Sequence, residues 1–142
     1  MIIMEVFFYG LFMDKDILIK NGINPSNPRK GYLNNYTLKI GQRASLIPCK
    51  NEKAYGMIME LDDEAVIRLY SEKSVADYIP EKVEVVTESK EHLIATCYNL
   101  PLELLTGTNE VYAKSLYELA KKLSFPEEYL DKIDRNIPKK GG

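Results

Sequence analysis

The sequence predicts an α+β fold, in which helices pack against a small mixed β-sheet or barrel. The chain has 142 residues, which is the length of a single domain, so we expect one domain over residues 1–142 with a flexible tail from about residue 137. Hydrophobic residues make up 45% of the chain and charged residues 28%, as in an ordinary globular protein. Strand-like segments open the chain and recur around one helix, and helical segments close it, an order typical of α+β domains.

A buried strand and a short helix are predicted at the start of the chain. Residues 2–8 are rich in Ile, Val and Phe, which is typical of a buried strand. Residues 13–20 place apolar side chains on one face behind Asp14, which favours a short helix. Residues 21–30 contain two prolines, one glycine and three asparagines, so we expect a loop there.

Two strands and a shorter edge segment are expected next. Residues 32–40 follow the alternating pattern of a strand. Residues 44–47 extend an edge, which Pro48 is expected to end because proline lacks the amide hydrogen that a sheet needs. Residues 55–61 form a further predicted strand.

One helix and two more strands follow in the second half of the chain. Asp62 is expected to cap a helix that ends near residues 71–74, and the acidic residues after it suit the positive end of the helix dipole. This capping role explains the acidic cluster better than a metal site does. Residues 82–87 alternate as a strand, and residues 92–100 form another, which Pro101 closes.

The C-terminal part is predicted to be helical. Thr108 or Asn109 starts the longest helix, whose apolar residues recur every three or four positions. Ser124 and Glu127 have the spacing of a capping box, in which the side chain of each residue accepts a hydrogen bond from the backbone amide of the other. A short helix over residues 126–133 is expected after it.

Charge and composition argue against several functional classes. The chain has 19 Lys and Arg and 21 Asp and Glu, so its net charge is −2 and nucleic acid is not an expected partner. His92 is the only histidine, which argues against a His-rich metal site. Cys49 and Cys97 form no CxxC motif, and we expect two reduced thiols in a cytoplasmic protein. The apolar stretches do not fit a signal peptide or a membrane span, so a membrane is not an expected partner.

Seven residues are candidates for a small-molecule site. The first four form a turn after the first strand, where a glycine lets a ligand approach backbone N–H groups, although a turn often needs a glycine for its own sake. Glu72 lies where the helix that Asp62 caps is expected to end, and there the helix dipole disfavours a charged carboxylate. If this carboxyl is buried there, it has a raised pKa and suits a general base, whereas the ordinary alternative is a solvated surface residue. Tyrosines flank these elements. The candidates are Tyr9, Gly10, Leu11, Phe12, Glu72, Tyr78 and Tyr112.

Four stretches, in this order, resemble the gamma-glutamylcyclotransferase-like family, which includes the avirulence-induced-gene-like proteins. They are similar to the family's first strand with its Y-G-S/T-L turn, its V-x-G-x-L-Y-x-L strand, its L-D-x-x-E segment and its closing L-P-x-x-Y-L segment. In this chain the stretches are residues 6–12, 55–62, 69–72 and 123–130. Two positions depart from the pattern, since Leu11 replaces a small hydroxyl residue and Pro80 replaces the usual arginine after Tyr78.

The resemblance implies an enzyme that cyclises a gamma-glutamyl amide to 5-oxoproline and releases an amino acid or amine. The α-amino group of the substrate attacks its own γ-carbonyl, so the enzyme has to hold a reactive conformer and move protons. Glu72 would be the general acid and base, and residues 9–12 with Tyr78 and Tyr112 would bind the substrate. The resemblance implies no metal and no cofactor, and we expect a monomer or homodimer.

Three other functions stay open. One is a gamma-glutamylamine cyclotransferase of the same fold. Another is a carboxylate-binding module that has lost the chemistry, which Leu11 and Pro80 motivate. The last is a structural or interaction domain without a ligand. A Glu72 side chain that is buried and faces the turn would favour an enzyme, whereas one that points into solvent would favour the binding module.

Overall fold

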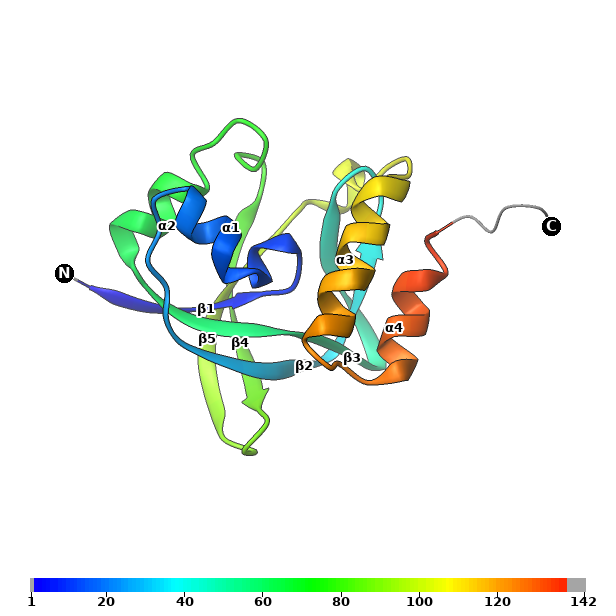
Figure 1. Cartoon of the computed structure of the whole chain (residues 1–142), viewed down its shortest axis with the longest axis horizontal. Helices are drawn as coiled ribbons and strands as arrows, with labels where there is room; N and C mark the ends of the chain where they lie inside the picture. The colour runs from blue at the N-terminus through cyan, green and yellow to red at the C-terminus, as the bar shows by residue number, and fades with distance from the viewer. Residues whose placement is uncertain (1, 138–142) are drawn as a thin grey trace.

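A computed structural model describes residues 2–137 of the chain, which form a closed five-stranded barrel and four α-helices (Figure 1). The strands are β1 (Ile3–Phe8), β2 (Ser26–Ile40), β3 (Ala44–Asp62), β4 (Ile79–Thr87) and β5 (His92–Asn99). The α-helices are α1 (Lys15–Lys20), α2 (Asp63–Leu69), α3 (Glu110–Lys122) and α4 (Glu127–Asp134), and the 3₁₀ helices are η1 (Leu11–Met13) and η2 (Leu102–Leu104). The expected α+β fold with a small barrel is confirmed. Most of the expected tail, residues 138–142, lies outside the described residues.

The barrel is mixed because its strands pair in both directions. The order around it is β1-β3-β2-β4-β5. Neighbouring strands are antiparallel except β1 and β5, which run parallel where Val6 lies opposite Thr96 and closes the barrel. In Figure 1, α1 and α2 lie toward one end of the molecule, and α3 and α4 lie side by side toward the other.

Two predictions about β2 and β3 are wrong. The expected loop over residues 21–30 is strand from Ser26, which pairs with Glu60, and Pro28 falls where the register of the pair shifts. Pro48 does not end a strand, because β3 runs from Ala44 to Asp62 and Pro48 lies opposite Tyr36. This part of β3 pairs only with β2, so a proline is accommodated on its free side.

The helix starts depend on capping side chains, most of which were predicted. Asp62 accepts a hydrogen bond from the Glu64 amide, and Asn109 accepts one from the Tyr112 amide, which confirms both caps. The capping box of Ser124 is wrong, because Pro126 occupies the N-cap of α4 and makes no side-chain cap. Ser124 instead has a positive φ of 61°, which places it in the turn between the helices.

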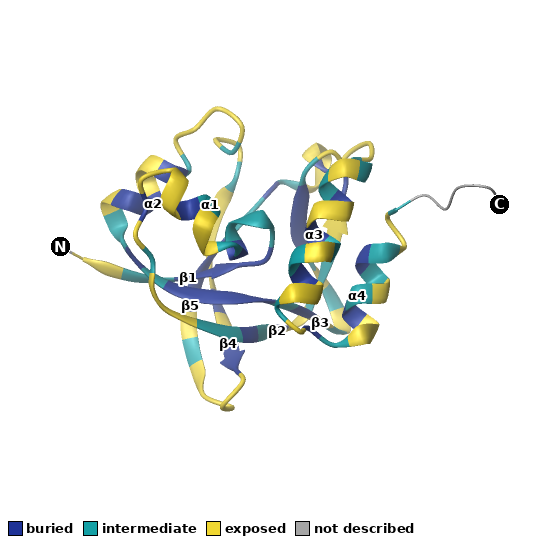
Figure 2. Cartoon of the chain, in the orientation of Figure 1, coloured by how far each residue is buried: buried dark blue, intermediate teal, exposed yellow. Residues whose placement is uncertain are grey.

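The core lies inside the barrel and beneath the helices. In Figure 2 the buried residues follow the strands and the facing sides of α3 and α4, whereas the outer helix faces are exposed. The largest fully buried apolar side chains include Phe7, Leu18, Ile23, Ile58, Met59, Leu61, Leu116, Tyr129 and Ile133. The predicted strand and helix stripes therefore supply the core, which holds the surrounding loops in place.

The cysteines and the histidine lie in ordinary structural positions. Cys49 and Cys97 are both free thiols, as expected, and Cys97 is buried. His92 lies at the exposed start of β5, with its Nδ1 3.6 Å from a carboxylate oxygen of Glu84. None of the helices within residues 2–137 has the length and apolar character needed to cross a membrane.

Candidate functional site

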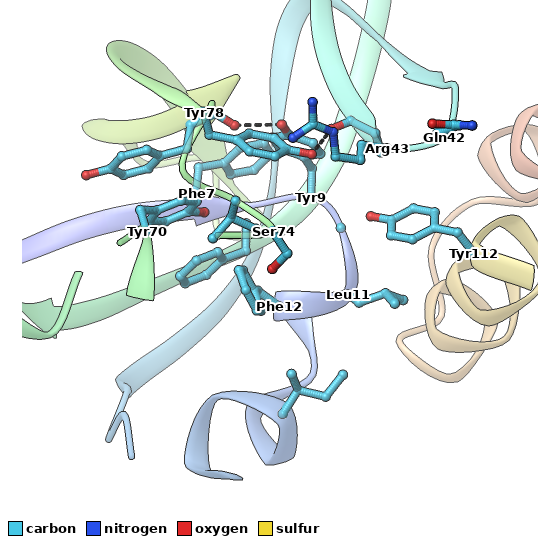
Figure 3. A pocket seen from close by; sticks show the side chains of 16 residues that line it. Phe7, Tyr9, Leu11, Phe12, Gln42, Arg43, Tyr70, Ser74, Tyr78 and Tyr112 are labelled. Carbon is cyan, nitrogen blue, oxygen red and sulfur yellow. Dashed lines mark hydrogen bonds between the residues drawn. The ribbon is translucent and has the colours of Figure 1, made fainter. Parts of the chain in front are cut away.

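A cavity of about 310 Å³ opens where the end of β1 and the turn after it meet five other segments of the chain. These segments are α1, the β2–β3 turn with the start of β3, the connection between α2 and β4, the end of β5 and the first turn of α3 (Figure 3). The residues that line the cavity are Phe7, Phe8, Tyr9, Gly10, Leu11, Phe12, Ile17, Gln42, Arg43, Ala44, Tyr70, Ser74, Val75, Tyr78, Tyr98 and Tyr112. Its volume is in the range of small-molecule sites.

The structure brings six of the seven predicted site residues to this cavity. They are the turn residues Tyr9, Gly10, Leu11 and Phe12, with Tyr78 and Tyr112. The seventh, Glu72, is exposed and does not line the cavity. Helix α2 ends at Leu69, so Glu72 lies three residues beyond it, outside the range of the dipole that was expected to act on its carboxyl.

Gly10 is required by the close approach of Tyr112 to the turn. A Cβ added at Gly10 would lie 2.5 Å from the Tyr112 hydroxyl oxygen, which is closer than any contact between such atoms. The hydroxyl group also interacts with the backbone of Leu11. Figure 3 shows the Tyr112 side chain reaching from α3 toward the turn. Helix α3 is thereby connected to the end of β1 at one side of the cavity.

Two tyrosine hydroxyls of the cavity wall form hydrogen bonds with the backbone of neighbouring strands. Tyr9 donates to the carbonyl oxygen of Tyr98 at 2.6 Å, and Tyr78 donates to that of Ala44 at 2.6 Å. Burial raises the pKa of Tyr78 to about 12 and holds the pKa of Tyr9 well above its usual range. Both groups therefore stay neutral hydrogen-bond donors at physiological pH.

Tyr70 and Tyr98 form an aromatic wall that was not predicted. Their rings stack 3.8 Å apart with an angle of 9° between the planes, and Phe12 meets Tyr70 edge-on at 6.1 Å. Burial raises the pKa of Tyr70 well above its usual range. The chain contains 10 tyrosines, but their spacing in the sequence does not show which rings meet.

Arg43 is a second residue that the sequence did not single out. It lies in the turn between β2 and β3, and its guanidinium carbon is 6.0 Å from the centre of the Tyr78 ring. Its Nη1 atom is 3.1 Å from the Asp77 carboxylate in the loop before β4, and the Arg43 side chain is one-third exposed. The guanidinium can therefore reach both the cavity and solvent.

The described lining of the cavity carries one positive charge and no negative charge. Among the described residues that line it, Arg43 carries the only charge at neutral pH, and Asp, Glu and His do not occur. Hydroxyl and amide groups come from the tyrosines, Ser74 and Gln42, and the other walls are apolar. A site with one cation, neutral donors and apolar walls is suited to an organic anion.

A metal centre is not supported within residues 2–137, because no three His, Cys, Asp or Glu side chains of this part come together in a suitable group. The acidic residues at the start of α2 serve the helix instead, as the hydrogen bond from Glu64 N–H to Asp62 shows.

Several solved structures share the fold of this chain. One is named gamma-glutamyl cyclotransferase, with a TM-score of 0.76 and 16% identity over 99% of this chain and 92% of that one. YkqA from Bacillus subtilis has a TM-score of 0.77 and 20% identity over 96% of this chain and 56% of that one. An AIG2-like protein from Mus musculus has a TM-score of 0.56 and 16% identity, over 68% and 76%. At these identities the likeness shows the fold alone.

Family membership depends on the sequence match. Among curated proteins no sequence matches this chain significantly. The sequence model of the AIG2-like family, however, matches residues 53–133. The matched segment includes Tyr70, Tyr78, Tyr98 and Tyr112, so it supplies part of the cavity wall, whereas the turn at residues 9–12 and Arg43 lie outside it. Because this match covers more than half of the chain, the protein belongs to the AIG2-like family, as the resemblance to gamma-glutamylcyclotransferase-like proteins predicted.

Proposed function

We propose that this protein binds a small organic carboxylate in the cavity between β1 and α3. The observation that carries the proposal is the position of Arg43, which is the only charged side chain among the described residues lining the cavity. The guanidinium has five N–H donors, and its hydrogen bond to Asp77 uses one of them. A ligand carboxylate can accept from the others in a charge-assisted pair.

The turn at residues 9–12 completes the proposed site. Tyr9, Gly10, Leu11 and Phe12 would bring backbone and side-chain groups against the ligand, and Tyr78 and Tyr112 would form its walls. The neutral hydroxyls of these tyrosines bring no negative charge near the ligand. The carboxylate would therefore meet the Arg43 cation and neutral lining groups, and it would share the guanidinium with Asp77.

The test compares two ligands of the same shape, 5-phenylpentanoate and its neutral amide, by isothermal titration calorimetry. We expect the carboxylate to bind at least about tenfold more tightly to the wild-type protein. Arg43→Gln should abolish that preference. Arg68→Gln is the matched control, because Arg68 is exposed on α2 and does not line the cavity. Equal affinity of the wild-type protein for both ligands would contradict the proposal.

A second candidate function is the cyclisation of a gamma-glutamyl amide with Glu72 as general acid and base. Two observations favour it. The chain belongs to the AIG2-like family, and a protein of the same fold is named gamma-glutamyl cyclotransferase. Glu72 also lies in the same loop as Ser74 and Val75, which do line the cavity. In this proposal a movement of that loop brings the carboxylate to the substrate.

The cyclisation is tested with a panel of two substrate classes, gamma-glutamyl amino acids and gamma-glutamylamines. The products measured are 5-oxoproline and the released amino acid or amine. If Glu72 carries the chemistry, Glu72→Gln abolishes turnover. The control Glu103→Gln changes another exposed glutamate that does not line the cavity, and it leaves turnover unchanged. Turnover that survives Glu72→Gln removes this residue from the mechanism. The panel also separates a cyclotransferase for amino-acid amides from one for gamma-glutamylamines. Absence of 5-oxoproline throughout the panel contradicts this function and leaves the carboxylate-binding proposal intact.

A further inference from the structure

We infer that a carboxylate bound at Arg43 controls the position of the loop between α2 and β4, because it competes with Asp77 of that loop for the guanidinium. The loop, residues 71–77, also contains Glu72. This inference rests on the proposed carboxylate site and adds that ligand binding there is coupled to a neighbouring segment of the chain.

The 71–77 loop is exposed between two anchored tyrosines. Its residues are exposed except Val75, which is half-buried. On one side of the loop the Tyr70 ring stacks on a ring of β5 at 3.8 Å. On the other side the Tyr78 hydroxyl donates to the backbone of β3 at 2.6 Å. A segment that is fixed at its ends and poorly buried between them can change position at little cost.

The ion pair between Asp77 and Arg43 joins this loop to the β2–β3 turn, with 3.1 Å between the carboxylate and Nη1. Two backbone hydrogen bonds of the loop are local, since the Val75 N–H donates to the Glu72 carbonyl oxygen and the Tyr78 N–H donates to that of Val75. Local bonds of this kind can be kept when the loop moves. The ion pair cannot be kept, so it favours the position of the loop that the structure shows.

A ligand carboxylate can compete with Asp77 because the two anions meet Arg43 in different surroundings. The Asp77 side chain is 57% exposed, so water screens its attraction to the guanidinium, and such exposed pairs are weak. A ligand in the cavity meets the guanidinium beside apolar walls, where less water screens the attraction. The two carboxylates also repel each other, and the one on the exposed loop can return to water.

Competition at Arg43 makes ligand binding and loop position reciprocal. The ligand binds more tightly when Asp77 has left the guanidinium, so its binding shifts the population toward the released loop. Glu72 belongs to the same loop, and its carboxylate therefore changes position with it. In the cyclisation proposal, this coupling would let Glu72 approach a substrate only after the substrate carboxylate has bound.

Limited proteolysis measures the release of the loop, because trypsin cuts after Lys73, which is exposed within it. We expect Asp77→Asn to be cut there about two- to fivefold faster than the wild-type protein, since the ion pair is lost. Asp131→Asn, a change of an exposed aspartate on α4, is the matched control and should be cut at the wild-type rate. Mass spectrometry identifies the cut, and circular dichroism checks that the variants are folded. Equal rates for Asp77→Asn and the wild-type protein would overturn the inference.

The ligand is the second variable of the same experiment. Saturating 5-phenylpentanoate should speed the cut in the wild-type protein toward the rate of ligand-free Asp77→Asn, whereas the neutral amide should not. It should leave the rate of Asp77→Asn unchanged, because that loop is already released. A small chromogenic trypsin substrate in the same solutions corrects for effects on the protease itself. Slower cutting, or an unchanged rate, at a concentration that calorimetry shows to be saturating would overturn the inference.

Arg43→Gln removes the other member of the ion pair and should raise the rate as Asp77→Asn does. The double variant should be cut no faster than either single variant, because both changes break the same interaction. Rate increases that multiply in the double variant would show that the two side chains act on the loop separately, which the inference does not allow.

Failure of the proposed function gives a different pattern. If the cavity has no carboxylate site, calorimetry shows no preference for 5-phenylpentanoate over its amide, and ligand control of the loop is overturned together with the site, even if Asp77→Asn releases the loop. If 5-phenylpentanoate binds through Arg43 while the cut after Lys73 keeps its rate, the carboxylate site stands and only its control of the loop is overturned.

Discussion

Tyr70 and Tyr98 stack face to face, with ring centroids 3.8 Å apart and planes 9° apart. Tyr70 is the C-cap residue of α2, and Tyr98 lies near the end of β5, so the stacked pair joins the helix to the barrel at the cavity wall. Tyr9 donates its hydroxyl hydrogen to the Tyr98 carbonyl oxygen, so the residue that follows β1 is bonded to the same strand. The wall is thus a packed structure in which loss of one ring affects the others.

Replacement of Tyr70 tests how far this wall depends on stacking. Tyr70→Ala should lower the free energy of unfolding by about 3 kcal/mol, because it removes a large ring and leaves a void beside Tyr98 and Phe12. Tyr70→Phe retains the ring and should cost less than about 1 kcal/mol. Urea unfolding, followed by circular dichroism, measures both. Equal losses in the two variants would show that the hydroxyl group, and not the ring, stabilises the wall.

Gly10 and Tyr112 should be coupled in a double-mutant cycle. Gly10→Ala puts a Cβ 2.5 Å from the Tyr112 hydroxyl oxygen, so we expect a loss of about 1 to 3 kcal/mol of unfolding free energy. Tyr112→Phe removes that oxygen, and the next atom of the ring, Cζ, lies at an ordinary 3.8 Å.

The double variant Gly10→Ala with Tyr112→Phe should therefore be more stable than the two single losses predict when added together, by about 1 kcal/mol. Urea unfolding of the four proteins measures this difference. Additive losses would mean that the methyl group is accommodated by a movement of the backbone and not by the space that the hydroxyl vacates.

Gly10 and Tyr112, which contact each other at the cavity, are the part of the site that local sequence patterns predicted. The turn was predictable because a glycine directly after an apolar strand is a local pattern. Tyr78 and Tyr112 were candidates because they flank the predicted site elements, and the family resemblance then implied that both bind the substrate. Each of these signals is contained within a few neighbouring residues or within a motif of known order.

Arg43 and Glu72 show why the rest of the site was not predictable. Arg43 reaches the cavity because β2 and β3 pair along almost their whole length, with register shifts that no local pattern reveals. The exposed position of Glu72 follows from the end of α2 at Leu69, and helix ends are the least certain part of a sequence-based assignment. The strand through Pro48 was missed for a related reason, because proline is tolerated only once the edge is known to be free.

The buried tyrosines predict a loss of stability at alkaline pH. Burial raises the pKa of Tyr78 to about 12 and also raises the pKa values of Tyr9 and Tyr70 above the usual value near 10. Above about pH 10 the unfolded chain gives up these protons while the folded protein keeps them, so the free energy of unfolding falls as the pH rises. The stabilisation is complete below about pH 10 and is lost progressively toward about pH 12.

Urea unfolding at about pH 9 and about pH 11 measures this effect, and the absorbance of tyrosinate follows the ionisation itself. Tyr78→Phe removes one of the contributing groups, so its stability should fall less steeply between the two pH values. An unfolding free energy that stays constant over this range would contradict the burial of the hydroxyl groups.

Asp77 should limit the affinity of the proposed site, because its carboxylate lies 3.1 Å from the Arg43 guanidinium. A ligand carboxylate has to share Arg43 with Asp77 and is repelled by it. Asp77→Asn removes this charge, and we expect 5-phenylpentanoate to bind roughly three- to tenfold more tightly. Asp131→Asn, which changes an exposed aspartate on α4 that does not line the cavity, is the matched control.

Salt gives an independent check of the same competition. Both side chains of the pair are partly exposed, so about 1 M NaCl should screen the repulsion and bring the affinities of the wild-type protein and Asp77→Asn closer together. Calorimetric titration at low and high salt measures this. Weaker binding by Asp77→Asn at both salt concentrations would mean that Asp77 holds the guanidinium in its binding position, and the ion pair would then support the site instead of competing with the ligand.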